Sequence, residues 1–115
     1  MSYMLLIVEP VGQRRERSEA EGHRAYAEML RFADTLKARG VLRASESLGS
    51  DARRLQKRDG RKDIVDGPFA EAKEMVGGFF LLDTASEDEA LAIAAECPAA
   101  EWCSVEVRQL APCYV

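Results

Sequence analysis

The sequence predicts a single α+β domain, and three observations support this. The chain has 115 residues, the usual size for one hydrophobic core, with 47% hydrophobic and 31% charged residues as in globular proteins. Short, almost wholly apolar runs predict buried strands. Ser18 and Ser86 each start a Ser-x-x-Glu pattern ahead of an apolar run, which predicts two capped helices. We therefore expect one domain that spans residues 1–115.

The first half of the chain predicts a strand, a helix and a second strand. The run from Tyr3 to Glu9 is almost wholly apolar and ends at Pro10, as a buried strand does. The helix that begins after Ser18 ends at Gly40. Its apolar residues recur at helical spacing and form one stripe, made of Tyr26, Met29, Leu30, Ala33 and Leu36. The run from Val41 to Leu48 follows as the second strand.

The middle of the chain predicts an inserted β-hairpin. Asp59-Gly60 supplies the positive φ angles of a tight turn, and the runs from Arg53 to Lys57 and from Lys62 to Val65 flank it. Asp66-Gly67-Pro68-Phe69 then interrupts regular structure, and Ala70 to Met75 is expected to form one helical turn.

The remaining residues predict a strand, a helix and a last strand. Gly77 to Thr84 is a strongly apolar strand, and the helix that begins after Ser86 stops at Pro98. Ser104 to Leu110 is the last strand. The order is therefore β-α-β, a hairpin, then β-α-β. This order predicts a ferredoxin-like βαββαβ sheet with both helices on one face.

The central strands are apolar on both faces, which predicts a homodimer. Leu5 and Ile7 point to one face of the sheet and Leu6 and Val8 to the other, because alternate side chains of a strand point to opposite faces. Two helices cover only one face. Burying even ~600 Å² of the other would contribute roughly 15 kcal/mol before the cost of association. We expect two sheets to pack into a closed or nearly closed barrel. The alternative is a monomer whose hairpin folds over the open face, although the hairpin is rich in Arg and Lys.

Charge and composition argue against several classes of function. The net charge is −4, and the basic residues Arg14, Arg15 and Arg17 are interleaved with glutamates, so we expect no nucleic-acid partner. No apolar run approaches the roughly 20 residues that cross a bilayer, and no signal peptide is recognisable, so we expect no membrane partner and a cytoplasmic protein. With one histidine and three cysteines we expect reduced thiols, no metal and no cofactor.

Two residues are candidates for acid–base chemistry. His23 is the only histidine, and a neutral imidazole is a suitable general base near pH 7. Asp66 lies on a turn that Gly67 and Pro68 make rigid, and Phe69 offers an apolar wall beside it. The alternatives are a surface histidine on a charged helix and an ordinary Asp-Gly turn.

The last strand adds a candidate for ligand binding. Val105 and Val107 suit the helix-covered face, which leaves Glu106 and Arg108 on the other face. Charged groups there are costly unless they are paired or face a water-filled cavity. Glu106 and Arg108 are therefore candidates to hold a small anionic ligand, and the alternative is a salt bridge between strands or subunits.

The block from Asp66 to Glu74, followed by Gly77-Gly78-Phe79-Phe80, resembles the signature of the YCII-related, or DGPF-domain, family. The resemblance covers almost the whole chain and implies a ferredoxin-like fold that dimerises as an α+β barrel with a pocket in each subunit. It also implies a His–Asp dyad, for which His23 and Asp66 are the matching residues. A few relatives are lyases that eliminate chloride from muconate-type acids, and similar barrels include muconolactone isomerases.

Two functions remain open from the sequence. The first is a cofactor-independent lyase or isomerase that acts on a small organic acid, with His23 moving the proton, Asp66 orienting it and Arg108 holding the substrate anion. The second is a non-catalytic ligand-binding or regulatory dimer, in which His23 is dispensable.

Overall fold

The computed structural model describes all residues from 1 to 115. Its elements, in chain order, are β1 (Ser2–Pro10), α1 (Gln13–Glu16), α2 (Glu19–Ala38), β2 (Leu42–Ser47), β3 (Arg53–Arg58), β4 (Arg61–Asp66), β5 (Glu74–Asp83), α3 (Glu87–Glu96), the 3₁₀ helix η1 (Pro98–Glu101) and β6 (Ser104–Gln109).

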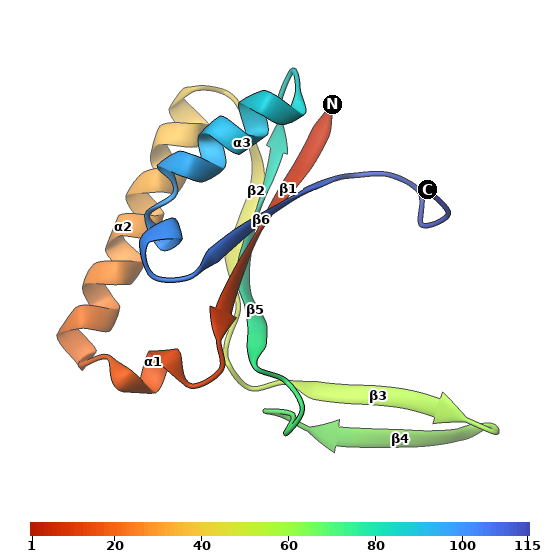
Figure 1. The fold of residues 1–115 in the computed structure, drawn as a ribbon. Helices are drawn as coiled ribbons and strands as arrows, with labels where there is room; N and C mark the ends of the chain where they lie inside the picture. The colour runs from red at the N-terminus through yellow and green to blue at the C-terminus, as the bar shows by residue number, and fades with distance from the viewer.

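Four of the strands form one antiparallel sheet in the order β2-β5-β1-β6. The helices α2 and α3 lie on one face of this sheet, and the other face carries no helix (Figure 1). The predicted α+β class and the ferredoxin-like strand order are confirmed. One chain contributes an open sheet and forms no closed barrel by itself.

The long helix α2 begins at the predicted capping box. The Ser18 hydroxyl accepts a hydrogen bond from the Glu21 amide at 3.1 Å, and the Glu21 carboxylate accepts one from the Ser18 amide at 3.0 Å. In α3 the pattern is only half formed, since Ser86 accepts from the Glu89 amide while Glu89 accepts from the Ala85 amide. Serine at both N-caps therefore satisfies amides that the first helical turn leaves unpaired.

The hydrophobic core lies between the helices and the sheet. Leu5 of β1, Leu82 of β5 and Leu36 of α2 are fully buried there. The rings of Phe32 and Phe80 meet edge to face with centroids 5.1 Å apart, which joins α2 to β5.

The predicted apolar stripe of α2 is only partly buried. Ala33 and Leu36 lie in the core, but Tyr26 is 54% exposed and Leu30 is 49% exposed. Phe32, which the stripe omitted, is buried instead. The physical reason is that Tyr26 and Leu30 line a cavity between α2 and the sheet rather than the closely packed core.

The predicted hairpin forms, with Asp59 at φ 50° and Gly60 at φ 75° in its turn. Strands β3 and β4 make a separate two-stranded sheet that projects from the domain on the side away from the helices (Figure 1). The hairpin does not fold over the open face of the main sheet, so it is not the lid that the monomeric alternative requires.

The expected helical turn from Ala70 to Met75 is wrong. The segment makes a tight turn in which the Ala72 amide donates to the Phe69 carbonyl at 2.9 Å, and β5 already begins at Glu74. The residues from Glu74 onwards pair with β1, because the backbone hydrogen bonds of the sheet outweigh the weak helical preference of so short a segment. The short helices α1 and η1 were not expected.

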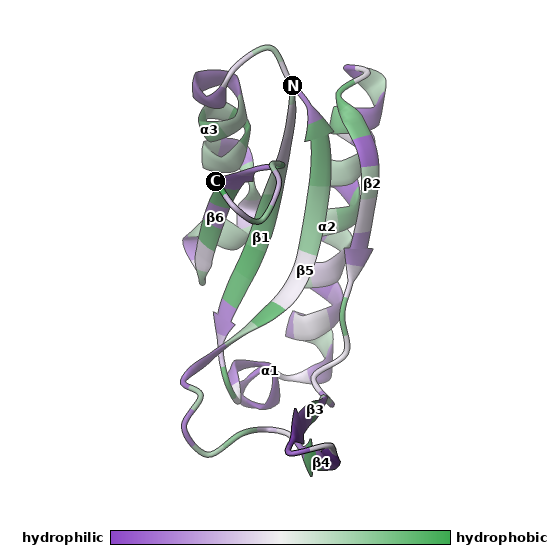
Figure 2. Ribbon diagram, turned by 90° about the vertical axis from the view of Figure 1, so that its right-hand side faces the viewer, coloured by the Kyte–Doolittle hydropathy of each residue, from purple (hydrophilic) through white to green (hydrophobic).

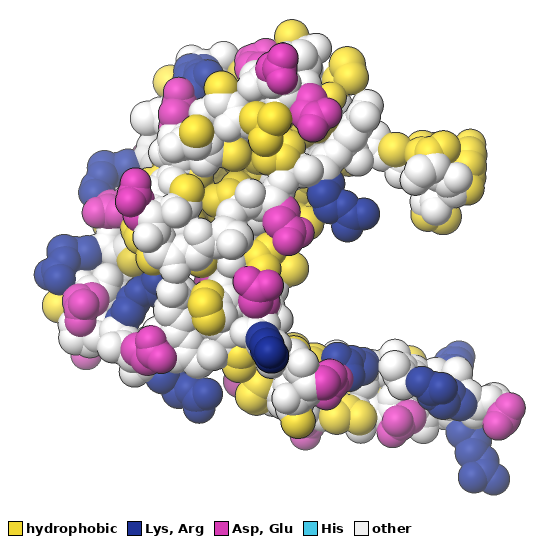
Figure 3. Space-filling model, in the orientation of Figure 1, with side chains coloured by type: hydrophobic (Ala, Val, Ile, Leu, Met, Phe, Trp, Pro, Cys, Tyr) yellow, Lys and Arg dark blue, Asp and Glu magenta, His cyan; other side chains and the backbone are white.

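The open face of the sheet is apolar along β1 and β5 (Figure 2). Met4, Leu6, Phe79 and Leu81 point to this face and are partly exposed. The hairpin and the C-terminal segment both project on this side of the molecule, and the surface between them is concave (Figure 3). The two-faced strands predicted from the sequence are therefore present, with one face uncovered.

Candidate functional site

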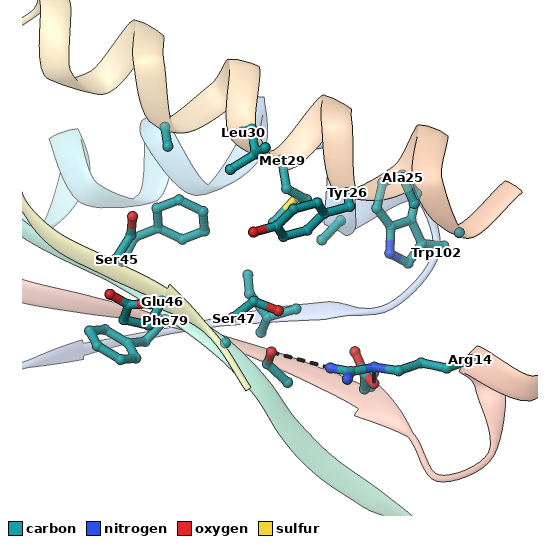
Figure 4. A pocket seen from close by; sticks show the side chains of 18 of the residues that line it. Arg14, Ala25, Tyr26, Met29, Leu30, Ser45, Glu46, Ser47, Phe79 and Trp102 are labelled. Carbon is teal, nitrogen blue, oxygen red and sulfur yellow. Dashed lines mark hydrogen bonds and ion pairs between the residues drawn. The ribbon is translucent and has the colours of Figure 1, made fainter. Parts of the chain in front are cut away.

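A cavity of about 490 Å³ lies between α2 and the edge of the sheet formed by β2 and β5. Its walls are largely apolar, and the side chains that converge on it come from α2, the strands and the end of η1 (Figure 4). The main apolar contributors are Tyr26, Met29, Leu30, Phe80 and Trp102. A cavity of this size and character is typical of small-molecule sites.

The most buried charged group at the cavity is the carboxylate of Glu9, at the end of β1. Glu9 is only 6% exposed, and its Oε1 accepts a hydrogen bond from Arg14 Nε at 2.6 Å. Arg14 belongs to α1, which folds back beside the end of β1 and so brings the guanidinium to the carboxylate. The opposite charge of Arg14 compensates the cost of burying Glu9.

Arg14 is itself held on three sides. Besides Glu9, it donates from Nη1 to the Leu48 carbonyl at 2.7 Å and from Nη2 to the Gly77 carbonyl at 3.3 Å. These contacts join α1 to the end of β2 and to β5. The guanidinium is therefore committed to the protein and fixes the position of the Glu9 side chain.

A β-bulge at Gly77 makes room for this ion pair. Ile7 is paired with Gly78 and Val8 with Val76, so Gly77 is the extra residue of β5. A Cβ atom at Gly77 would lie 2.8 Å from Glu9 Cδ and 2.9 Å from Arg14 Nη2. Only glycine therefore leaves the space in which Glu9 and Arg14 meet.

Other charged residues lie around the cavity but are more exposed. The guanidinium of Arg17 stacks on the ring of Trp102, 5.6 Å from its centroid. Asp34 and Lys37 line the cavity from α2, and both are exposed.

His23 and Asp66, the predicted pair, form no hydrogen bond or ion pair with each other within the chain. Neither residue lines the cavity. His23 is exposed on α2. Asp66 ends β4, and its carboxylate pairs with Arg53 Nε at 3.0 Å, with 79% of its side chain exposed. The His–Asp dyad therefore stays a prediction that one subunit alone does not assemble.

The three predicted ligand-binding residues also lie outside the cavity. The ring of Phe69 packs under the Arg54 guanidinium, 3.8 Å from the ring centroid, and Arg54 also pairs with Glu71. Glu106 and Arg108 are exposed on the open face of β6, as the alternation of the strand predicts, and neither forms an ion pair within the chain. The sheet separates them from the cavity.

Glu9, Arg14 and the bulge at Gly77 were not predicted from the sequence. The available signals were a single carboxylate that ends an otherwise apolar strand and a pair of adjacent glycines in a buried strand. Arg14 was interpreted as part of a solvated face, because its glutamate neighbours in sequence gave no sign that it turns inward.

The structure has no group of three His, Cys, Asp or Glu side chains placed to hold a metal ion. No helix in it has the length and apolar composition that crossing a membrane requires.

Comparison with known proteins places the chain in a family. It matches the YCII-related domain over residues 1–113. The protein belongs to this family. An uncharacterized protein of Rhizobium meliloti (strain 1021) is 50% identical to it over 54 residues, which are 45% of this chain and 44% of that protein. The match thus spans less than half the length of this relative.

Among solved structures, this YCII-related protein is similar to 5-chloro-2-hydroxyhydroquinone dehydrochlorinase (TftG) from Burkholderia phenoliruptrix AC1100, which was solved in complex with 2,5-dihydroxybenzoquinone. The TM-score is 0.56 at 18% identity, covering 96% of this chain and 94% of the other. At this identity the likeness is one of fold, and it confirms the fold that the sequence predicted.

Proposed function

We propose that this YCII-related protein is a cofactor-independent lyase or isomerase of the cytoplasm, acting on a small organic acid in the cavity beneath α2. The observation that carries the proposal is a buried carboxylate, Glu9, beside an aromatic-lined cavity of about 490 Å³. A buried, positioned carboxylate beside a cavity is suited to general acid–base chemistry.

The geometry supports a proton transfer that needs no further group. Elimination and isomerisation beside a ring or carbonyl require a base to remove a proton and a donor to stabilise the negative charge that develops. Glu9 is the candidate base, and the cavity-lining Tyr26 is the candidate hydroxyl donor. The similar fold of a dehydrochlorinase supports the same class of reaction.

Binding and turnover test the proposal separately. Trp102 is the only tryptophan and lines the cavity, so its fluorescence should report occupancy by 2,5-dihydroxybenzoquinone. Release of chloride from 5-chloro-2-hydroxyhydroquinone above the uncatalysed rate would show turnover. Ser45→Phe should fill the cavity and abolish both signals, whereas Ser50→Phe, an exposed loop substitution outside the cavity, should preserve them.

The outcomes separate the two functions left open by the sequence. Binding with chloride release supports the enzyme. Binding without turnover of this substrate or of other hydroxylated or carboxylated ring compounds favours the non-catalytic ligand-binding dimer. If none of these compounds binds, the cavity is not a ligand-binding site for this class of compound.

The working form of the protein in this proposal is a homodimer that buries the open face of the sheet. Leu6 and Leu81 leave an apolar surface there, and burial of such a surface is strongly favourable. A twofold arrangement also offers Glu106 of one subunit a partner in Arg108 of the other, which would satisfy two charges that have no ion pair within the chain.

Sedimentation or light scattering tests the dimer. Leu81→Glu should give a folded monomer, since a carboxylate on the open face is costly to bury between two sheets. The matched control is Leu91→Glu on α3, where the native side chain is 48% exposed on the helical side of the molecule. A wild-type protein that is monomeric at micromolar concentration would exclude the dimer.

A further inference from the structure

At the end of the cavity formed by Glu9 and Arg14, the hydrogen-bond donors of Arg14 are already used, whereas the Glu9 carboxylate can still accept. Arg14 uses Nε, Nη1 and Nη2 on Glu9 and on two backbone carbonyls. The Glu9 carboxylate uses Oε1 in its bond to Arg14. Its Oε2 lies beside the α-carbon of Gly77 and accepts no hydrogen bond from the chain, and it is not an enclosed, unsatisfied atom. What the protein presents to a ligand at this end is therefore a hydrogen-bond acceptor with negative charge.

The cationic side chains do not change this balance. Arg17 is stacked on Trp102, and Lys37 is exposed on α2 close to the exposed Asp34 of the same helix. Neither joins Arg14 to form a buried site for a carboxylate or phosphate. An anionic group placed against Glu9 would be repelled by its negative charge, and water would screen this repulsion little because Glu9 is buried.

The walls select for a flat apolar body. Tyr26, Phe80 and Trp102 line the cavity together with Met29, whose flexible thioether adapts to neighbouring rings. Figure 4 shows Tyr26, Met29 and Trp102 on the same side of the cavity, opposite the strand β2, which carries Ser45 and Ser47. A planar ring is a shape that these surfaces can contact on both faces.

We infer that the cavity recognises a hydroxylated aromatic ring, whose hydroxyl group donates a hydrogen bond to Glu9 Oε2 while Arg14 holds the carboxylate in place. The inference rests on the proposed function, because it names the substrate class of the same cavity. Among small organic acids it selects those whose acidic group is a ring hydroxyl over those that carry a carboxylate. A bonded, charge-assisted hydroxyl contributes about 1.5–3 kcal/mol, which corresponds to roughly ten- to a hundredfold in affinity.

The first experiment measures the need for a donor. Trp102 fluorescence is titrated with hydroquinone, with its dimethyl ether, which cannot donate, and with benzoate, which is an anion. The wild-type protein should bind hydroquinone at least tenfold more tightly than either of the other two compounds. Equal binding of hydroquinone and its dimethyl ether would overturn the inference and leave the cavity intact as a site.

The second experiment detects the charge of Glu9 through a bound chromophore. The phenol and phenolate forms of 4-nitrocatechol have different absorption spectra, so the pH midpoint of the bound probe can be measured directly. In Glu9→Gln the negative charge is gone and Arg14 remains, so the bound probe should ionise at a pH lower by roughly one unit or more. A change of packing alone would not produce this shift.

The matched control is Glu74→Gln. Glu74 is exposed, lies outside the cavity and is carried by the strand that pairs with β1. This variant loses the same charge and should leave the ionisation midpoint unchanged. An unchanged midpoint in Glu9→Gln overturns the inference while probe binding sustains the proposed function. If the wild-type protein binds none of these rings, both fail together.

Discussion

Glu9 and Gly77 share one space in the sheet. The Glu9 carboxylate lies over the α-carbon of Gly77, and a Cβ atom there would come within 2.8 Å of Glu9 Cδ. Gly77 is the bulged residue of β5, and its carbonyl also accepts from the Leu48 amide at 2.9 Å and from Arg14. A local irregularity in one strand therefore decides where the charged end of another strand points.

Alanine at the two adjacent glycines should have different effects. At Gly77 the new methyl group meets the ends of two flexible side chains, so Gly77→Ala should displace Glu9 and Arg14 and reduce ligand binding. At Gly78 the methyl group would lie 2.9 Å from the backbone carbonyl of Glu46, which cannot rotate away. Gly78→Ala should therefore cost more stability, about 1–3 kcal/mol, as overpacking does.

Urea unfolding and hydroquinone titration of both variants measure these effects. Gly22→Ala is the control for unfolding, because nothing lies within 4 Å of its Cβ position in α2 and alanine favours the helix. It should raise stability by about 0.5–1 kcal/mol. Equal stability loss at Gly77 and Gly78 with unaffected binding would contradict the role given to Gly77.

Removal of Glu21 should destabilise the protein in a pH-dependent way. Hydrogen bonds from the Ser18 amide and then the Ser18 hydroxyl lower the pKa of Glu21 below its usual value of 4.5. A carboxyl whose pKa is lower in the folded state stabilises the fold above its unfolded pKa, and this contribution is lost as the pH falls through the folded pKa. Glu21→Ala should therefore lower the melting temperature at pH 7 and have a smaller effect near pH 3.

The control for Glu21 is Glu28→Ala, also an exposed position of α2 but outside the capped first turn. Its effect on melting should be small and nearly independent of pH. If the two variants lose stability in parallel at every pH, the capping box contributes nothing through the charge of Glu21.

The sequence was sufficient for the fold because the signals that define it are local. The capping residue Ser18, the Asp59-Gly60 turn and the apolar run through Leu5 each specify an element from neighbouring residues alone. The alternation of apolar and charged residues in β6 also predicted correctly that Glu106 lies on the open face of the sheet. The failures at Ala70 to Met75 and in the stripe of α2 arose where pairing with a distant strand and a cavity between helix and sheet decide the outcome.

The candidate site was not predictable in the same way. Glu9 and Arg14 are five positions apart in sequence, but their meeting depends on a bulge at Gly77 and on carbonyls from β2 and β5. No local pattern encodes these contacts. His23 and Asp66 attracted notice because their residue types are chemically versatile, whereas the cavity is assembled from residues whose types are individually ordinary.

The three thiols should react in an order set by burial. Burial, and secondarily the charge of Glu9, raises the pKa of Cys103 from 9.0 to about 11. Burial also raises the pKa of Cys97, while Cys113 is exposed. A thiol-reactive disulfide at pH 8 should therefore label Cys113 first, with Cys103 and Cys97 much slower, because the thiolate is the reactive form.

Alkaline stability gives an independent check on Cys103. A thiol whose pKa is raised in the folded state favours the fold below its unfolded pKa, and this contribution is lost as the pH rises from 9.0 towards 11. Cys103→Ser should lose less stability than the wild-type protein over this range. Labelling of Cys103 as rapid as that of Cys113, followed by mass spectrometry, would contradict its burial.

The predicted His–Asp dyad is decided by His23→Ala, measured for binding and for turnover on the same sample. His23 is exposed and outside the cavity, so we expect the affinity for hydroquinone to stay within twofold of the wild-type value. The rate of turnover then distinguishes a catalytic His23 from a dispensable one. Lost turnover with retained binding would mean that His23 acts across the subunit interface, since Asp66 lies on the hairpin that projects beyond the open face. The Asp66→Asn variant should then show the same loss. Unchanged binding and turnover in both variants would eliminate the dyad and leave Glu9 as the acid–base group.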